Sequence, residues 1–351
     1  MPKSRRYLLI SLCALFIVGL AWFFMRSTAP VVPEAIKRGF SEALTAARNG
    51  QPGAARVLYQ QLARPDISPK RRVWLHAELP NYPSSVALKL ADADLQHEEP
   101  EVRIAAIKSI SGLVPSGQRS LLLGPLLDDS DQSVRLAAVN ALLGLSPDDL
   151  GLYFGPLEQA IDAWQQVLKS APESADNHYQ LARLHLHNAE LKEAQQELDK
   201  TLQLAPDNLP ALVMQIEVLD RQGQSEAARE LLAKQLKAQP DSAYLQHALG
   251  LWLLHHGQNE FALLGLSKAV ELEPDNKDYR YDLATTLHGE QELEAAQKQL
   301  QEIVQRHPND RKARVLLINY WKESGQLQNV QILLAQLEQQ NPDDPALQQG
   351  L

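Results

Sequence analysis

Cysteine and catalytic motifs are what this 351-residue sequence has least of. Its one cysteine, Cys13, lies in an apolar N-terminal run, which excludes an internal disulfide, a cysteine-based zinc site and a CxxCH haem attachment. A Gly-x-Ser-x-Gly elbow, a P-loop and a His-Glu-x-x-His motif are also absent. We therefore expect no enzyme activity, no cofactor and no metal.

Basic residues are too few for a nucleic-acid-binding surface. Of the 34 Lys and Arg, four lie in the first 26 residues, which contain no acid, so the remainder carries 43 Asp and Glu against 30 Lys and Arg. Nucleic-acid phosphates need a basic face. The acidic balance excludes nucleic acid as the expected partner and argues against a body lying flat on anionic lipid.

The longest apolar run lies near the N-terminus. Residues 7–25 carry no charge and follow a basic tail at residues 1–6. A run of about 20 apolar residues spans a bilayer, whereas a cleavable signal has an apolar region of only ~7–15 residues. We predict a transmembrane signal anchor at 7–25, a linker at 26–34, a cytoplasmic N-terminus, and everything after the anchor outside the cytoplasm.

The C-terminal half is organised by a proline that returns every 34 residues, at Pro172, Pro206, Pro240, Pro274, Pro308 and Pro342. Between consecutive prolines lie two amphipathic segments separated by a small polar turn, so each unit is expected to be a helical hairpin. Proline lacks the N–H that a helix interior needs and therefore closes each hairpin. One hairpin cannot bury its apolar face alone, so residues 173–342 are predicted to stack as an α-solenoid.

Three residue types stand at fixed distances before each proline. An alanine twelve residues before it, where a close helix crossing admits only a small side chain, recurs as Ala194, Ala228, Ala262 and Ala296, and Val330 takes this place in the last unit. A leucine stands eight residues before it, at Leu198, Leu232, Leu266, Leu300 and Leu334, and the turn is marked by Gly223, Gly257 and Gly325. At these residues the chain resembles the tetratricopeptide repeat family, which implies five such repeats over residues 173–342.

A weaker pattern precedes these repeats. Residues 99–107 (EPEVRIAAI) return 32 residues later as residues 131–139 (DQSVRLAAV), an order that resembles the second helix of a HEAT repeat. The acid is expected to cap the helix, the Val and the Ala pair to pack, and Arg103 and Arg135 to bond neighbouring acids. The resemblance implies HEAT-like helical repeats over residues 35–145.

Residues 146–172 are predicted to form a hybrid half-repeat between the two repeat types. Ala160 and Trp164 stand at the offsets of a tetratricopeptide second helix, but no first helix precedes them, so the helix at residues 132–143 is expected to be the partner. Residues 343–351 are left as a C-terminal tail. The predicted fold class is all-α: an N-terminal transmembrane helix followed by an α-solenoid in which HEAT-like repeats continue into five tetratricopeptide repeats.

This order of repeats resembles the C-terminal half of bacterial multihaem cytochrome proteins with doubled CXXCH motifs, although the chain has none of the haem motifs. The resemblance implies a bacterial source and a periplasmic solenoid, hence a single-pass protein of the inner membrane. The layout also resembles membrane-anchored tetratricopeptide proteins that hold apocytochromes during c-type cytochrome assembly.

The first helices of such arrays line a concave groove, and its positions can be counted back from each proline. The candidate peptide-binding residues are Tyr179, Arg183, His187, Val213, Glu217, His247, Leu251, His255, Tyr281, Thr285 and Asn319. This mixture of aromatic, aliphatic and polar groups suits an extended or helical peptide segment. An alternative is that Tyr179 and Tyr281 only pack between repeats. The Lys/Asn/Arg set of the carboxylate-clamp subfamily is not reproduced.

Three functions from different classes remain open. The leading hypothesis is a membrane-anchored scaffold or adaptor that binds protein segments during assembly of a periplasmic or envelope complex. The second is an accessory of c-type cytochrome maturation that handles apocytochrome, haem or metal, although the histidines lack the i, i+3 or i, i+4 spacing of a helical metal pair. The third is a purely structural spacer.

Overall fold

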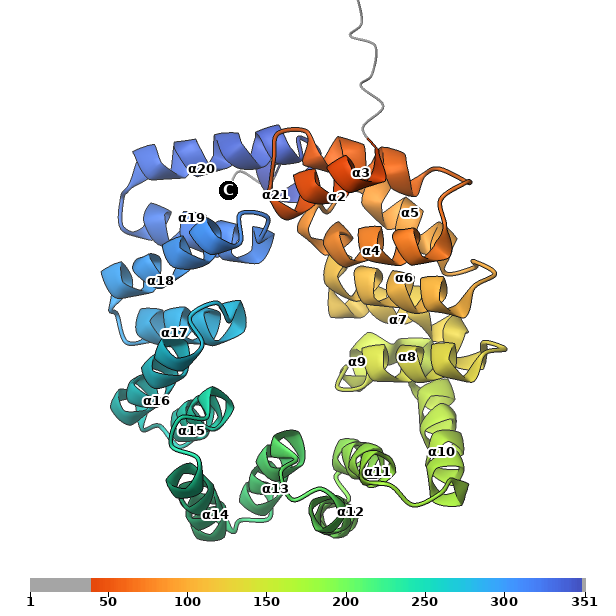
Figure 1. The fold of residues 1–351 in the computed structure, drawn as a ribbon, viewed down its shortest axis with the longest axis vertical. Helices are drawn as coiled ribbons and strands as arrows, with labels where there is room; N and C mark the ends of the chain where they lie inside the picture. The colour runs from red at the N-terminus through yellow and green to blue at the C-terminus, as the bar shows by residue number, and fades with distance from the viewer. Residues whose placement is uncertain (1–38, 349–351) are drawn as a thin grey trace, which may run out of the picture. The chain divides into compact units, whose positions relative to one another are not determined.

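The computed structural model describes residues 39–348. Of two compact units, Met1–Gly39 and Phe40–Leu351, the second carries all the helices described below. Within the described residues it contains α-helices and short 3-10 helices and no strand (Figure 1). The predicted all-α solenoid is therefore confirmed.

The membrane part of the predicted fold needs correction. Among residues 39–348 no helix has both the length and the apolar character to cross a bilayer. The longest, α10 (Phe154–Ser170), has 17 residues and carries charged side chains, whereas a span needs about 20 apolar residues. The predicted anchor at 7–25 lies outside the described residues. We therefore correct the fold class to an α-solenoid and withdraw the single-pass inner-membrane location.

Helices of unequal length build the first part of the solenoid. They are α2 (Phe40–Arg48), α3 (Ala54–Leu62), α4 (Pro69–Glu78), α5 (Ser85–Asp94), α6 (Pro100–Leu113), α7 (Ser116–Leu123), α8 (Gln132–Leu142), α9 (Pro147–Leu150) and α10, with 3-10 helices η1 (Leu79–Asn81), η2 (Gly124–Asp128) and η3 (Gly151–Tyr153). One buried apolar cluster extends from Ala46 in α2 to Leu184 in the first helix after α10. The first part and the 34-residue repeats therefore share a core.

The HEAT-like motifs behave largely as the sequence predicts. Their Val and second Ala positions are fully buried, at Val102, Ala106, Val134 and Ala138. Arg103 Nη2 lies 2.8 Å from Asp129 Oδ1, and so links α6 to the turn before α8. Asp131 caps α8 by accepting from the Ser133 and Val134 amides, but Glu99 makes no such bond at α6. The capping prediction holds for one motif only.

The 34-residue units fold as helical hairpins. Their helices are α11 (Ala175–His187), α12 (Leu191–Leu204), α13 (Leu209–Arg221), α14 (Ser225–Ala238), α15 (Ala243–His255), α16 (Asn259–Leu272), α17 (Lys277–Gly289), α18 (Leu293–Arg306), α19 (Arg311–Glu323) and α20 (Leu327–Gln340). The alanines twelve residues before the prolines are 0% exposed, at Ala194, Ala228, Ala262 and Ala296. The close crossing predicted from these residues is confirmed.

The turn inside each hairpin requires a left-handed backbone at one position. Gly223, Gly257 and Gly325 have φ of 77°, 70° and 74°, a region that glycine adopts without a Cβ penalty. The equivalent residues of the other two hairpins are Ala189, with φ 58°, and Gln291, with φ 64°. These two side chains sit in a conformation that disfavours them.

The last helices contact the first. The Gly53 amide before α3 donates to the Gln339 carbonyl at 2.7 Å, and Asn341 Nδ2 donates to the Pro83 carbonyl at 2.8 Å. Asn309 Nδ2 also donates to Glu78 at 3.1 Å. Figure 1 shows α20 and the short α21 (Pro345–Gln348), which falls in the predicted tail, beside α2 and α3. We call this set of contacts the seam.

A buried polar network holds α4, α5 and α6 together. Arg72 Nη1 donates to both carboxylate oxygens of Asp94 at 2.8 Å, and His76 Nε2 lies 2.8 Å from the same carboxylate. His76 Nδ1 lies 3.0 Å from Ser109 Oγ. Burial alone would raise the pKa of Asp94, but the bonds from His76 and Arg72 outweigh it and hold that pKa below its ordinary value.

Replacing Gln291 by glycine should stabilise the protein. Glycine removes the left-handed penalty of ~1–2 kcal/mol, offset in part by the larger entropy of the unfolded chain, so Q291G should raise the free energy of unfolding by about 0.5–1 kcal/mol. Urea denaturation measures it. The matched control is Gln258→Gly, at a position with φ −97°, which should destabilise; equal effects of the two variants would disprove the assignment.

Asp94 should make stability sensitive to acid. Its pKa is lower in the folded than in the unfolded state, so its contribution is present above the unfolded value of ~3.9 and is lost as the pH falls through the folded value. D94N should cost about 3–5 kcal/mol at pH 7, because it leaves a buried Arg72 charge unpaired. Unfolding measured from pH 6 to pH 2 should show a smaller acid-dependent loss for D94N than for the wild type.

The seam should open when Asn341 is truncated. N341A leaves the Pro83 carbonyl without its partner, at a cost of about 1–3 kcal/mol, and hydrogen exchange at the Gly53 amide should accelerate. Gln222→Ala is the control, because Gln222 Nε2 makes a similar bond to the Leu191 carbonyl at 3.1 Å, away from the seam. If both variants leave Gly53 exchange unchanged, the seam contacts do not act together.

Candidate functional site

The predicted groove residues all lie on the first helices of the hairpins. They are Tyr179, Arg183 and His187 on α11, Val213 and Glu217 on α13, His247, Leu251 and His255 on α15, Tyr281 and Thr285 on α17, and Asn319 on α19. Within each helix they are four residues apart and therefore share one face. Two cavities open along this face.

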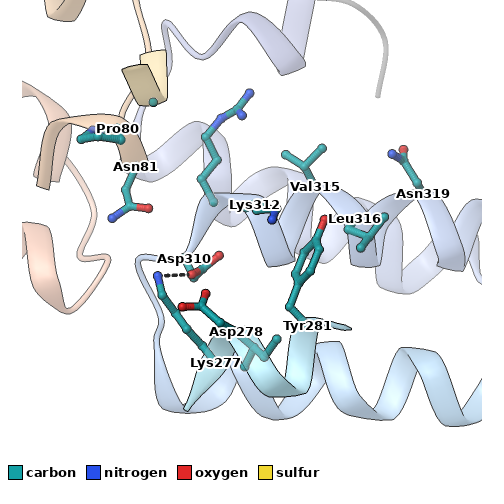
Figure 2. A pocket seen from close by; sticks show the side chains of 13 residues that line it. Pro80, Asn81, Lys277, Asp278, Tyr281, Asp310, Lys312, Val315, Leu316 and Asn319 are labelled. Atoms are coloured by element: carbon teal, nitrogen blue, oxygen red, sulfur yellow. Dashed lines mark hydrogen bonds and ion pairs between the residues drawn. The ribbon is translucent and has the colours of Figure 1, made fainter. Parts of the chain in front are cut away.

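The first cavity, which we call the α17/α19 pocket, has a volume of about 480 Å³. It is lined by Tyr281 and Asn319 together with Pro80, Asn81, Gly112, Lys277, Asp278, Ile303, Asp310, Arg311, Lys312, Val315 and Leu316. Figure 2 shows Pro80 and Asn81, from the start of the solenoid, opposite side chains of α17 and α19. The seam therefore supplies one wall of this pocket.

Most charges in the α17/α19 pocket are already engaged. Lys277 Nζ lies 2.7 Å from Asp310 Oδ2, the dashed contact in Figure 2, and Arg311 is paired with the buried Asp344 at 2.6 Å. Lys312 Nζ lies 3.7 Å from the centroid of the Tyr281 ring, a cation–π contact. Burial, with smaller effects of nearby carboxylates, raises the pKa of Tyr281, so its hydroxyl is neutral at pH 7.

Two amides in this pocket are available to a ligand. Asn81 and Asn319 line it, and within residues 39–348 neither side chain has a hydrogen-bond partner. An amide offers two donors and an acceptor, which match the N–H and C=O of an extended backbone. Val315 and Leu316 supply an apolar surface beside them. The pocket can therefore hold a peptide backbone and one apolar side chain.

The second cavity, the α11/α13 pocket, has a volume of about 380 Å³ and is lined by Leu143, Gly144, Arg183, Leu186, His187, Met214 and Arg221. Arg183 bonds to Gln180 at 3.0 Å, and Arg221 is paired with Glu217 at 2.6 Å. His187 lies 3.8 Å from Glu158. The lining itself contains no acid.

Several predicted residues hold neighbouring helices together instead. His247 Nε2 lies 2.8 Å from Asp282 Oδ2 of the next first helix, and Thr285 Oγ1 donates to the Asp282 carbonyl. Tyr179 and Val213 pack partly buried against core clusters. Leu251 is 43% exposed and the His255 side chain 75% exposed, yet neither lines either pocket.

Sequence reasoning missed part of the α17/α19 pocket. Lys277 and Lys312 stand in the first turn of α17 and α19, one turn before the counted positions, so a longer count back from each proline would have found them. No sequence signal pointed to Pro80 and Asn81, because they reach the pocket only through the seam. In the part of the chain that the structure describes, no three His, Cys, Asp or Glu side chains gather as a metal site would need.

Stacked helical hairpins with a 34-residue period and a free first-helix face define a tetratricopeptide-type solenoid. Family models described as tetratricopeptide repeat match residues 152–208, 190–251 and 263–330. The prediction of tetratricopeptide repeats is confirmed over these residues. The HEAT-like assignment of residues 35–145 and the likeness to cytochrome proteins remain predictions.

Individual relatives are distant. An uncharacterized protein, y4yS, of Sinorhizobium fredii is 35% identical over 91 residues, which are 26% of this chain and 50% of y4yS. This chain therefore spans about half the length of that relative. Among solved structures, yeast Tom70 matches with 14% identity over 81% of this chain and 59% of Tom70, at a TM-score of 0.48. YrrB, described as a tetratricopeptide protein with an unusual peptide-binding site, matches with 22% identity over 54% of this chain and 98% of YrrB, at a TM-score of 0.36.

Proposed function

We propose that this protein is a scaffold that binds extended segments of other proteins along its first-helix face, with the α17/α19 pocket as the main contact. The observation that carries the proposal is the pair of unbonded amides, Asn81 and Asn319, beside the apolar Val315 and Leu316. Solenoids of stacked repeats commonly present such surfaces to partners.

The chemistry of the pocket favours a peptide over a charged small molecule. Lys277 and Arg311 are held by Asp310 and Asp344, so they add little net charge for an ionic ligand. Lys312 remains over the Tyr281 ring and exposed to solvent. An extended segment would bond the amides through its backbone and place one aliphatic or aromatic side chain against the ring.

Truncating Asn319 should weaken peptide binding. Peptides selected from a random library against the full chain would be measured by fluorescence polarisation. N319A should raise Kd about five- to tenfold, since one lost hydrogen bond is worth about 1–1.5 kcal/mol. Asn140→Ala is the control, because Asn140 is an exposed asparagine on α8 outside both pockets.

Two results would contradict the proposal. Peptides that bind N319A and wild type equally would place the binding surface elsewhere on the molecule. A library from which no peptide is enriched would favour the purely structural spacer.

A further inference from the structure

The half-repeat at α10 lacks a first helix. Ala160, Trp164 and Val167 stand twelve, eight and five residues before Pro172, the offsets that face the first helix in every complete repeat. The chain before α10 offers only α9, with four residues, and η3, with three. Neither is long enough to cover a helix of 17 residues.

The same three positions are closed in complete repeats. They are 0–1% exposed at Ala194, Leu198 and Thr201, at Ala262, Leu266 and Ala269, and at Ala296, Leu300 and Ile303. On α10, in contrast, Val167 is 41% exposed, and Ala160 and Trp164 are only half-buried. The packing face of α10 is therefore partly uncovered.

Helix α8 replaces the missing helix only in part. It packs against α10 as the sequence predicts, but a groove of about 360 Å³ stays open between them. The groove is lined by Leu127, Asp128, Gln132, Arg135, Leu136, Val139, Pro156, Gln159, Ala160, Ala163, Trp164 and Val167. It contains one acid and one base, and Arg135 Nη1 is bonded to the Asp129 carbonyl at 2.7 Å. Its floor is apolar and its net charge is zero.

We propose that this groove binds an amphipathic α-helix of a partner protein, which docks as the absent first helix of the half-repeat. The contact would continue the interface by which the chain stacks its own hairpins. The groove runs from Pro156 to Val167, about 17 Å along α10 at 1.5 Å per residue, which suits roughly three helical turns. The chain's own first helices each have 13 residues.

The complete repeats define the chemistry of the occupant. In the third hairpin a Cβ on Gly250 of α15 would lie 2.6 Å from Leu266 Cγ, so a residue without a side chain is needed at that crossing. The partner helix should likewise carry a Gly or Ala where it crosses Ala160, flanked by leucines. A second copy of this chain is a poor donor, because α11, α13, α15, α17 and α19 are each packed within their own repeats.

The test uses a synthetic helix as the probe. A fluorescent peptide with the sequence of residues 241–258, stapled at the exposed positions of Leu251 and His255, would be titrated against the full chain. Binding should saturate, and a peptide with Gly250→Phe should bind at least tenfold more weakly. Ala163→Trp, at an exposed residue that lines the groove, should weaken binding at least tenfold, as should Val167→Glu.

The control is Ala233→Trp, at an exposed residue of α14 outside the groove, which should leave binding unchanged. Three results would overturn the proposal. One is no binding up to 1 mM peptide; another is equal binding by wild type and A163W, which would mean that the probe displaces α15 in its own repeat. The third is a dimer of the full chain, in analytical ultracentrifugation, that A163W dissociates. Because the groove and the α17/α19 pocket share no residue, either proposal can fail alone.

Discussion

The close approach of two helices at one small residue per repeat is the interaction on which the solenoid depends. Alanines such as Ala194 and Ala228 are fully buried because the first helix of the hairpin lies directly over them. In the third hairpin even alanine is too large, since a Cβ on Gly265 would lie 3.0 Å from the Gln246 carbonyl oxygen. Because this crossing takes up one side of each first helix, the opposite side is left for the pockets and for contacts such as His247 to Asp282.

Features set by neighbouring residues could be predicted from the sequence, because a repeat's hairpin is a local structure. The prolines, the alanine crossings and the glycine turns all lie where the 34-residue spacing places them. The candidate site could be predicted only in part: Tyr281 and Asn319 line the α17/α19 pocket, but six of their companions on the first-helix face line neither cavity or are engaged in helix contacts. Pro80 and Asn81 depend on the curvature summed over every repeat, which no single motif encodes.

The junction between the two parts shows how packing can be satisfied and incomplete at once. A continuous buried core passes from α2 to α11, so α8 and α10 are held firmly. Yet Val167 remains in solvent where the equivalent Ile303 is buried. Sequence offsets identified the missing helix correctly, but only the structure shows that its substitute is smaller than the space it occupies.

The seam makes the number of repeats a structural constant. In an open solenoid each repeat touches only its neighbours, so the gain or loss of one unit changes length and little else. Here Pro83 and Asn341 meet although 258 residues separate them. Deleting any 34-residue unit would withdraw the last helices from the first and leave Glu78, Pro83 and Gly53 without their partners. Recombination between repeats, an easy route of change for repeat genes, would therefore disrupt this chain at a point far from the deletion.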